Sequence, residues 1–309
     1  MSLDLARISA LPAKVVRRVR GLPGSIIART AIRRHERLYY SPTASVPSSV
    51  TLEGISAFLR CAGIEPAATL HVHSAWEHLN SGHFSAAELV KQLLAIVGDD
   101  GTLVMPAFPS HTMQVPGGVF DVKRTPSAGG LLTEMFRRYP GVLRSINLNH
   151  SVCAFGPNAD FLTRDHHRSE TSWDQFSPYY RLREIDNAWI IGLGVGHRLK
   201  VATSLHCVES ALWKGNAYYR KLFREQVCYT YKTATGETGQ HCYRRRTGQI
   251  YTPKLAKHFT PDELIEDCID GLEVYDIRAR TLIDKAIALG REGKTMYVWP
   301  VPWPWYFRP

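Results

Sequence analysis

The feature that most constrains the fold is an apolar strand, an amphipathic helix and a second apolar strand in direct succession. The two strands are Thr69–His73 and Thr102–Met105. Between them, Ser85 and Glu88 form a capping box that predicts where the helix begins, and Gly98 can end it in the left-handed conformation. Because parallel strands need a crossover connection, this order predicts a parallel pair inside a layered α/β sheet.

Further segments extend the layered pattern along the chain. Val227–Tyr231 and Gln240–Tyr243 flank a turn at residues 235–239, which predicts a β-hairpin. Thr260–Glu263 has an N-cap threonine, a proline at the first helical position and a glutamate at the third, which predicts a late helix. Other helices are expected at 52–61 and 131–138, and other strands at 151–155 and 188–192.

The charge of +10 is concentrated at the N-terminus. Residues 1–37 hold nine Lys and Arg against Asp4 and Glu36. Residues 1–49 are therefore expected to form a basic arm and linker, followed by one domain over 50–309. Residues 1–37 are suited to a membrane surface or an acidic partner, whereas the nearly balanced body gives no expectation of nucleic-acid binding. Oligomerisation is left open.

Two absences in the sequence bear on location and redox state. No apolar run reaches the roughly 20 residues that span a bilayer, and charged residues interrupt any secretory signal. A cytoplasmic protein is expected, with peripheral membrane contact through the arm left open. The six cysteines form no C-x-x-C pair, which argues against a structural zinc site or a disulfide framework and predicts reduced, packed thiols.

One segment combines residues suited to proton transfer. Ser204–Glu209 follows the glycine-rich turn Gly192–Gly196, and a strand, a turn and a helix in this order would place it at the carboxyl edge of the sheet. His206 and Glu209 are three residues apart, so they share one face of a helix. Imidazole can accept a proton near neutral pH, and a carboxylate can fix its tautomer. From the residues alone, an ordinary surface pair remains the alternative.

Two other motifs carry weaker chemical signals. Gly192–Gly196 lacks the glycine spacing of a dinucleotide fingerprint and the lysine of a P-loop, so a tight turn is the simpler interpretation. His71 and His73 alternate along a strand and would face the same side, which would permit shared metal ligation. Hydrogen-bonded histidines without a metal are the alternative.

A series of segments in order resembles the aminoglycoside 3-N-acetyltransferase (antibiotic N-acetyltransferase) family. The resemblance covers about residues 50–300, and many motifs in order are more specific than any one of them. The matching segments are Val72–Trp76, Val97–Pro106, Phe120–Ser127, Glu134–Ser145, Ser151–Pro157, Phe161–His166, Ser177–Leu182, Gly192–His197 and Thr203–Glu209.

This resemblance implies a three-layer α/β/α fold with a mixed central sheet, together with the small C-terminal hairpin and helix region. It also implies acetyl-CoA as donor, an amine as acceptor and no metal. His206 matches the family's catalytic histidine, with Glu209 as its acidic neighbour. The positions expected near acetyl-CoA, its thioester or its phosphates are His73, Ser74, Arg144, Ser145 and Ser151.

Two departures from the family pattern matter: the first removes one hydroxyl contact, and the second bears on the acceptor. Ala75 replaces a serine, and Arg198 and Lys200 replace an acidic stretch before His206. Like-charge repulsion would disfavour a polycationic acceptor, so Arg198 and Lys200 are expected to bind substrate phosphate. The sequence therefore predicts an N-acetyltransferase acting on an amino sugar or sugar nucleotide in polysaccharide or secondary metabolism. The alternatives are an aminoglycoside-resistance acetyltransferase, a metal-dependent hydrolase using His71 and His73, and a basic binding module without enzymatic activity.

Overall fold

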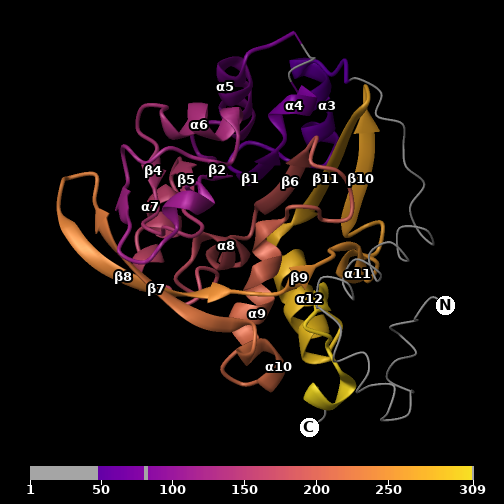
Figure 1. The fold of residues 1–309 in the computed structure, drawn as a ribbon. Helices are drawn as coiled ribbons and strands as arrows, with labels where there is room; N and C mark the ends of the chain where they lie inside the picture. Colours follow the sequence, from indigo (N-terminus) through magenta and orange to yellow (C-terminus); the bar gives the residue numbers. More distant parts are fainter. Residues whose placement is uncertain (1–47, 80–82, 308–309) are drawn as a thin grey trace.

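The computed structural model describes residues 48–79 and 83–307, so the predicted basic arm at 1–37 lies outside the described residues. A seven-stranded sheet in the order β10-β11-β6-β1-β2-β5-β4 organises the molecule (Figure 1). At its centre β1 (Thr69–Ser74) pairs in parallel with β2 (Thr102–Pro106) and with β6 (Ala188–Leu193). The parallel pair predicted from the strand–helix–strand order is confirmed.

The outer strands run antiparallel to their neighbours, which makes the sheet mixed, as expected. They are β4 (Leu143–Arg144), β5 (Val152–Phe155), β10 (Leu264–Ile269) and β11 (Leu272–Arg278). The three adjacent central strands β6, β1 and β2 therefore direct their carboxyl ends to one common edge, where α/β proteins usually bind ligands.

Helices cover both faces of the sheet and complete three layers (Figure 1). On one face lie α3 (Leu52–Cys61), α5 (Ala86–Val97) and α6 (Leu131–Arg137). On the other lie α8 (Pro178–Arg181), α9 (Cys207–Leu212) and the long α12 (Ala279–Arg291). The remaining short helices are α4 (Trp76–Leu79), α7 (Ala159–Thr163), α10 (Ala217–Arg220) and α11 (Pro253–Ala256).

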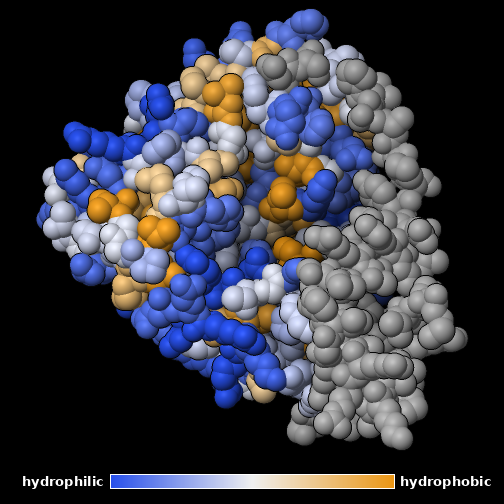
Figure 2. Space-filling model, in the orientation of Figure 1, coloured by the Kyte–Doolittle hydropathy of each residue, from blue (hydrophilic) through white to orange (hydrophobic). Residues whose placement is uncertain are grey.

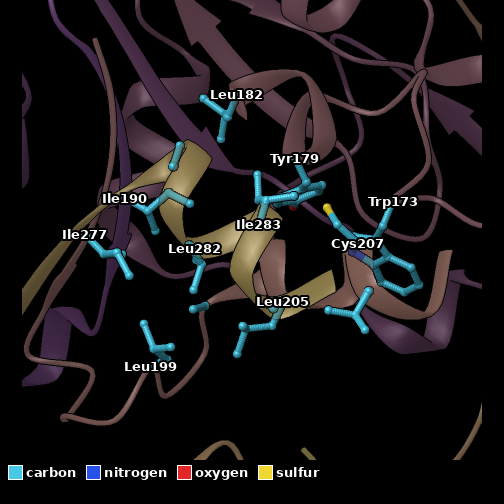
Figure 3. Packing of buried hydrophobic residues seen from close by; sticks show 14 of the residues in the cluster. Trp173, Tyr179, Leu182, Ile190, Leu199, Leu205, Cys207, Ile277, Leu282 and Ile283 are labelled. Atoms are coloured by element: carbon cyan, nitrogen blue, oxygen red, sulfur yellow. The ribbon is translucent and has the colours of Figure 1, made fainter. Parts of the chain in front are cut away.

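Local signals and core packing agree at the best-defined helices. The capping box of Ser85 and Glu88 is present at the start of α5, and Gly98 ends the helix with a φ of 68°. On the opposite face, Leu282 and Ile283 of α12 pack over Ile190 of β6 in the same buried cluster (Figure 3). Apolar burial on both faces holds the sheet between its helices.

A second sheet contains the predicted hairpin and a disulfide. It orders β3 (Val119–Asp121), β7 (Phe223–Lys232) and β8 (Thr238–Arg246). Cys228 and Cys242 face each other across the hairpin with Cα atoms 4.0 Å apart and form a disulfide. The prediction that all thiols are reduced is therefore wrong for this pair, because strand register brings together cysteines whose spacing has no recognisable signature. The other four cysteines are free.

The predicted helix at Thr260–Glu263 is wrong. The carboxylate of Glu263 accepts a hydrogen bond from the backbone N–H of Thr260 at 2.8 Å, as a helix cap would require. However, the chain then continues as β10 and pairs with β11 from Leu264 to Ile269. Pairing of β10 with β11 in a tight hairpin overrides the capping signal because it satisfies a whole row of backbone groups.

The C-terminal segment adds β12 (Tyr297–Trp299), which pairs with β9 (Gln249–Ile250). Within residues 48–79 and 83–307, no helix has both the length and the apolar character needed to cross a membrane. The face seen in Figure 2 is mainly hydrophilic, with hydrophobic residues in small separate patches.

Candidate active site

His206 and Glu209 form a buried hydrogen-bonded pair. His206 ends the 3₁₀ turn Thr203–His206, and Glu209 lies one turn later in α9. His206 Nδ1 lies 2.6 Å from Oε1 of Glu209. An ionised carboxylate only accepts hydrogen bonds, so the ring donates from Nδ1. The neutral imidazole therefore carries its lone pair on Nε2, as a general base requires.

The surroundings of His206 favour the neutral ring. Burial lowers the pKa of His206 below its usual value, the charge of Arg246 lowers it further, and Glu209 opposes both effects. Trp173 packs against the ring with centroids 4.8 Å apart. Glu209 is completely buried, whereas His206 keeps 8% of its surface exposed. The histidine is thus the member of the pair that a substrate can reach.

His206 lines a pocket of about 640 Å³ at the carboxyl edge of the central strands. The end of β1 supplies His73 and Ser74, and the glycine turn after β6 supplies Gly194. The pocket therefore brings together the β1 segment and the 192–209 segment, which are far apart in the sequence. Its volume lies within the range of small-molecule sites in proteins.

Two further residues act on Glu209 and were missed at the sequence level. The hydroxyl of Tyr297 donates to Oε1 of Glu209 at 2.6 Å, and Nη1 of Arg246 donates to the Tyr297 oxygen at 3.2 Å. Tyr297 begins β12 and Arg246 ends β8. No motif pointed to either residue, because only the folded chain brings these strand ends behind α9.

His71 and His73 do not gather the ligands of a metal site. Their ring centroids are 4.6 Å apart, but only His73 lines the pocket. Burial lowers the pKa of His73 to about 3, so its ring is neutral. Within the described residues, no group of three or more His, Cys, Asp or Glu side chains is placed to hold a metal ion. The metal-dependent hydrolase therefore gains no support from this geometry.

Arg144, Ser145 and Ser151 lie apart from the pocket that His206 lines. Arg144 is 7% exposed, and its guanidinium donates to the carbonyls of Ala107 and Thr125. It also donates to Oγ of Ser151 at 3.2 Å.

Ser145 is fully buried, and its Oγ lies 2.8 Å from Nδ1 of His166. All three side chains are thus engaged in internal bonds that join the loops around β4 and β5. Their contact with acetyl-CoA stays a prediction.

Arg198 and Lys200 occupy different environments. Lys200 is exposed and lines the pocket, whereas Arg198 does not line it and donates its backbone N–H to the Glu266 carboxylate. The acidic side chain of Glu273 lines the same pocket, and both charged groups lie near Gly196. A Cβ at Gly196 would be 3.3 Å from Oε2 of Glu273 and 3.7 Å from Nζ of Lys200. The positive charge expected at this side of the pocket is therefore offset.

Comparison with known proteins agrees with this architecture. The family model described as aminoglycoside 3-N-acetyltransferase matches residues 71–289. Aminoglycoside N(3)-acetyltransferase IV from Salmonella sp is 30% identical over 149 residues, which cover 48% of this chain and 54% of that protein. The chain thus spans about half the length of this relative.

Solved structures of similar proteins share the fold. The structure of AAC-IIIb binary with CoASH has a TM-score of 0.64 at 20% identity, covering 79% of this chain and 97% of the other. The structure of AAC-VIa bound to sisomicin has a TM-score of 0.63 at 19% identity, covering 78% and 97%. The mixed α/β sheet, the buried His–Glu pair and the family match over residues 71–289 lead to one conclusion: this chain belongs to the aminoglycoside 3-N-acetyltransferase family.

Proposed function

We propose that the protein transfers an acetyl group from acetyl-CoA to a primary amine of an amino-sugar acceptor. The observation that carries the proposal is the buried pair of His206 and Glu209 at the wall of the pocket. A neutral imidazole with its tautomer fixed by a carboxylate is suited to accept a proton from an amine. The similar protein found with CoASH supports acetyl-CoA as the donor.

The reaction needs no covalent enzyme intermediate. As the acceptor nitrogen attacks the thioester carbonyl, a C–N bond forms and Nε2 of His206 takes the proton that the amine loses. The C–S bond then breaks, and the leaving thiolate takes its proton from the imidazolium. Glu209 stabilises the imidazolium between these two transfers. Holding both substrates in one pocket supplies the proximity that direct transfer requires.

Aminoglycosides are the acceptor class best supported. The pocket includes Glu77 and Glu273 beside a single lysine, Lys200. Carboxylates favour a polycation, and Glu273 offsets the repulsion on which the sequence-level expectation relied. The complex of a similar protein with sisomicin supports the same class. A phosphate-bearing amino sugar, which Lys200 would favour, remains the competing acceptor.

A thiol-release assay with acetyl-CoA tests the proposal. We expect sisomicin to be turned over with a kcat/KM at least about tenfold above that of glucosamine 6-phosphate. Glu273→Gln should reduce that ratio, and Lys200→Gln should raise it. A higher kcat/KM for glucosamine 6-phosphate than for sisomicin would instead identify phosphorylated amino sugars as the acceptor class.

Donor binding can be tested without an acceptor. Acetyl-CoA at about 100 times its Kd should stabilise the folded protein by about 2.7 kcal/mol, seen as a higher melting temperature. Desulfo-CoA, which lacks the acetyl thioester, is the matched control ligand for the contribution of the thioester to binding. No thermal shift with acetyl-CoA, together with no thiol release for any amine, would refute the acetyltransferase proposal.

A further inference from the structure

The wall behind Glu209 is built by strands outside the seven-stranded sheet. Tyr297, at the start of β12, is fully buried and donates to Oε1 of Glu209 at 2.6 Å. Arg246, at the end of β8, donates to the Tyr297 oxygen at 3.2 Å. Arg246, Tyr297, Glu209 and His206 thus form one continuous chain of hydrogen bonds that ends at the pocket.

The bonds converge on a single carboxylate oxygen. Oε1 of Glu209 receives both the ring N–H of His206 and the hydroxyl of Tyr297, each at 2.6 Å. Oε2 has no hydrogen-bond partner among the described residues. Any rotation of the carboxylate away from His206 therefore breaks its bond to Tyr297 as well. Burial raises the pKa of Tyr297 well above its usual value, so the hydroxyl stays protonated as a donor.

We propose that Tyr297 is a positioning residue that fixes Glu209 against His206, and that Arg246 acts through Tyr297 in the same assembly. The role matters for catalysis only within the proposed function, in which His206 accepts the proton of the amine. A second donor on the same carboxylate oxygen keeps Oε1 in place beside Nδ1, which in turn keeps the lone pair of Nε2 directed at the pocket.

Arg246 also acts on His206 through its charge. Its Nε lies 3.9 Å from Oε1 of Glu209, and its positive charge lowers the pKa of His206. Glu209, from α9, raises the pKa of His206, and His150, from the loop between β4 and β5, faces His206 with its own pKa lowered by burial and by His206. Removal of the Arg246 charge should therefore raise the pKa of His206, because Glu209 would then be opposed by burial alone.

A neighbouring tyrosine provides the matched control. Tyr218 is also buried, and its hydroxyl donates to the backbone carbonyl of Pro300 at 2.8 Å. Its ring lies 6.2 Å from that of Tyr297, but it makes no bond to Glu209. Tyr218→Phe therefore removes an equivalent buried hydrogen bond from the same aromatic cluster while leaving the carboxylate held in place.

The first experiment compares the kinetics of Tyr297→Phe and Tyr218→Phe. In Tyr297→Phe, kcat should fall by about tenfold to hundredfold, the range of a hydrogen bond to a charged group, while both KM values change by no more than about twofold. Tyr218→Phe should lower the melting temperature similarly and keep the wild-type kcat. Equal loss of kcat in the two folded variants would reduce Tyr297 to a structural role and overturn the proposal.

The second experiment does not depend on turnover. NMR titration of the His206 ring in the free protein should show a changed Nδ1–H resonance in Tyr297→Phe and a raised pKa in Arg246→Met. Arg245→Met is the control, because Arg245 pairs with Glu225 and the carbonyl of Gln114 instead. Unchanged His206 signals in both Tyr297→Phe and Arg246→Met would overturn the positioning role. Changed signals in a protein that acetylates no amine would support that role and refute the proposed function instead.

Discussion

The ring of Tyr275 lies directly against the backbone of Gly192, where β11 pairs with β6. A Cβ at Gly192 would lie 2.1 Å from Cε1 of Tyr275, far closer than two carbon atoms can approach. The glycine is thus required by a ring from the neighbouring strand, at the point where β6 leads into the pocket.

Gly192→Ala should therefore destabilise the protein. Inserting a methyl group into this contact should lower the free energy of unfolding by about 1–3 kcal/mol, measured by urea denaturation. Gly215→Ala is the control, because a Cβ there meets nothing within 4 Å. Equal stability of the two variants would show that Tyr275 can move aside without cost.

His206→Ala tests the general base. Loss of a positioned base should lower kcat by about 10²–10⁴-fold and leave acetyl-CoA affinity nearly unchanged, as measured by steady-state kinetics and calorimetry. Glu209→Gln should cost less, since an amide can still accept from the ring N–H but cannot stabilise the imidazolium. A folded His206→Ala protein with wild-type kcat would leave the mechanism without its base.

Buried histidines should make the protein less stable in mild acid. Burial lowers the pKa of His73 and His166 to about 3 and that of His241 to about 4. Below pH 6.5 the unfolded chain binds protons at these rings and the folded chain does not, so stability falls as pH falls towards 4. Burial raises the pKa of Asp276 to about 6, so below this pH the folded chain binds a proton there that the unfolded chain does not. This stabilising effect offsets the loss from one histidine.

His73, His166 and His241, less Asp276, should together contribute up to about 3 kcal/mol per pH unit, because each unmatched proton costs about 1.4 kcal/mol. His71 and His150, whose pKa burial also lowers, should make the slope steeper. Urea denaturation between pH 7 and pH 5 measures this slope. His241→Gln has no titrating ring at position 241, so the slope should be smaller by up to about 1.4 kcal/mol per pH unit, the value for one proton. A wild-type protein equally stable at both pH values would contradict the assignment of neutral buried rings.

The disulfide between Cys228 and Cys242 should be detectable and stabilising. Alkylation without reductant should modify four of the six cysteines in the denatured protein. Reduction should lower the free energy of unfolding by about 3 kcal/mol, as expected for closure of a loop of this length. The Cys228→Ser/Cys242→Ser protein should be equally destabilised and should not respond to reductant. Six reactive thiols without reductant would show that the bond does not form.

The sequence predicted those parts of the fold that depend on local signals. Ser85 and Glu88 locate the start of α5, because capping involves residues three apart. The segment Thr260–Glu263 carries a similar signal but leads into β10, because β10 and β11 form a hairpin whose row of backbone hydrogen bonds outweighs one capping interaction. A capping pattern alone does not report on such competition.

The candidate site divides in the same way. His206 and Glu209 could be found from their spacing and from the family resemblance, since both lie in one short segment. Tyr297 and Arg246 could not, because each reaches Glu209 from a different strand. Arg144 shows the converse: it matches a family segment, but its guanidinium binds backbone carbonyls away from the pocket.

The central position of β1 has a consequence for the kinetics of folding. Thr69 pairs with Thr102 on one side and with Ala188 on the other. The first contact closes a short loop, and the second must wait for a much longer one, which costs more chain entropy. The β1–α5–β2 unit can therefore form early, while the floor of the pocket is completed only when β6 docks. Assembly of the reactive centre should accordingly be a late, slow phase of refolding, well after most helical structure has formed.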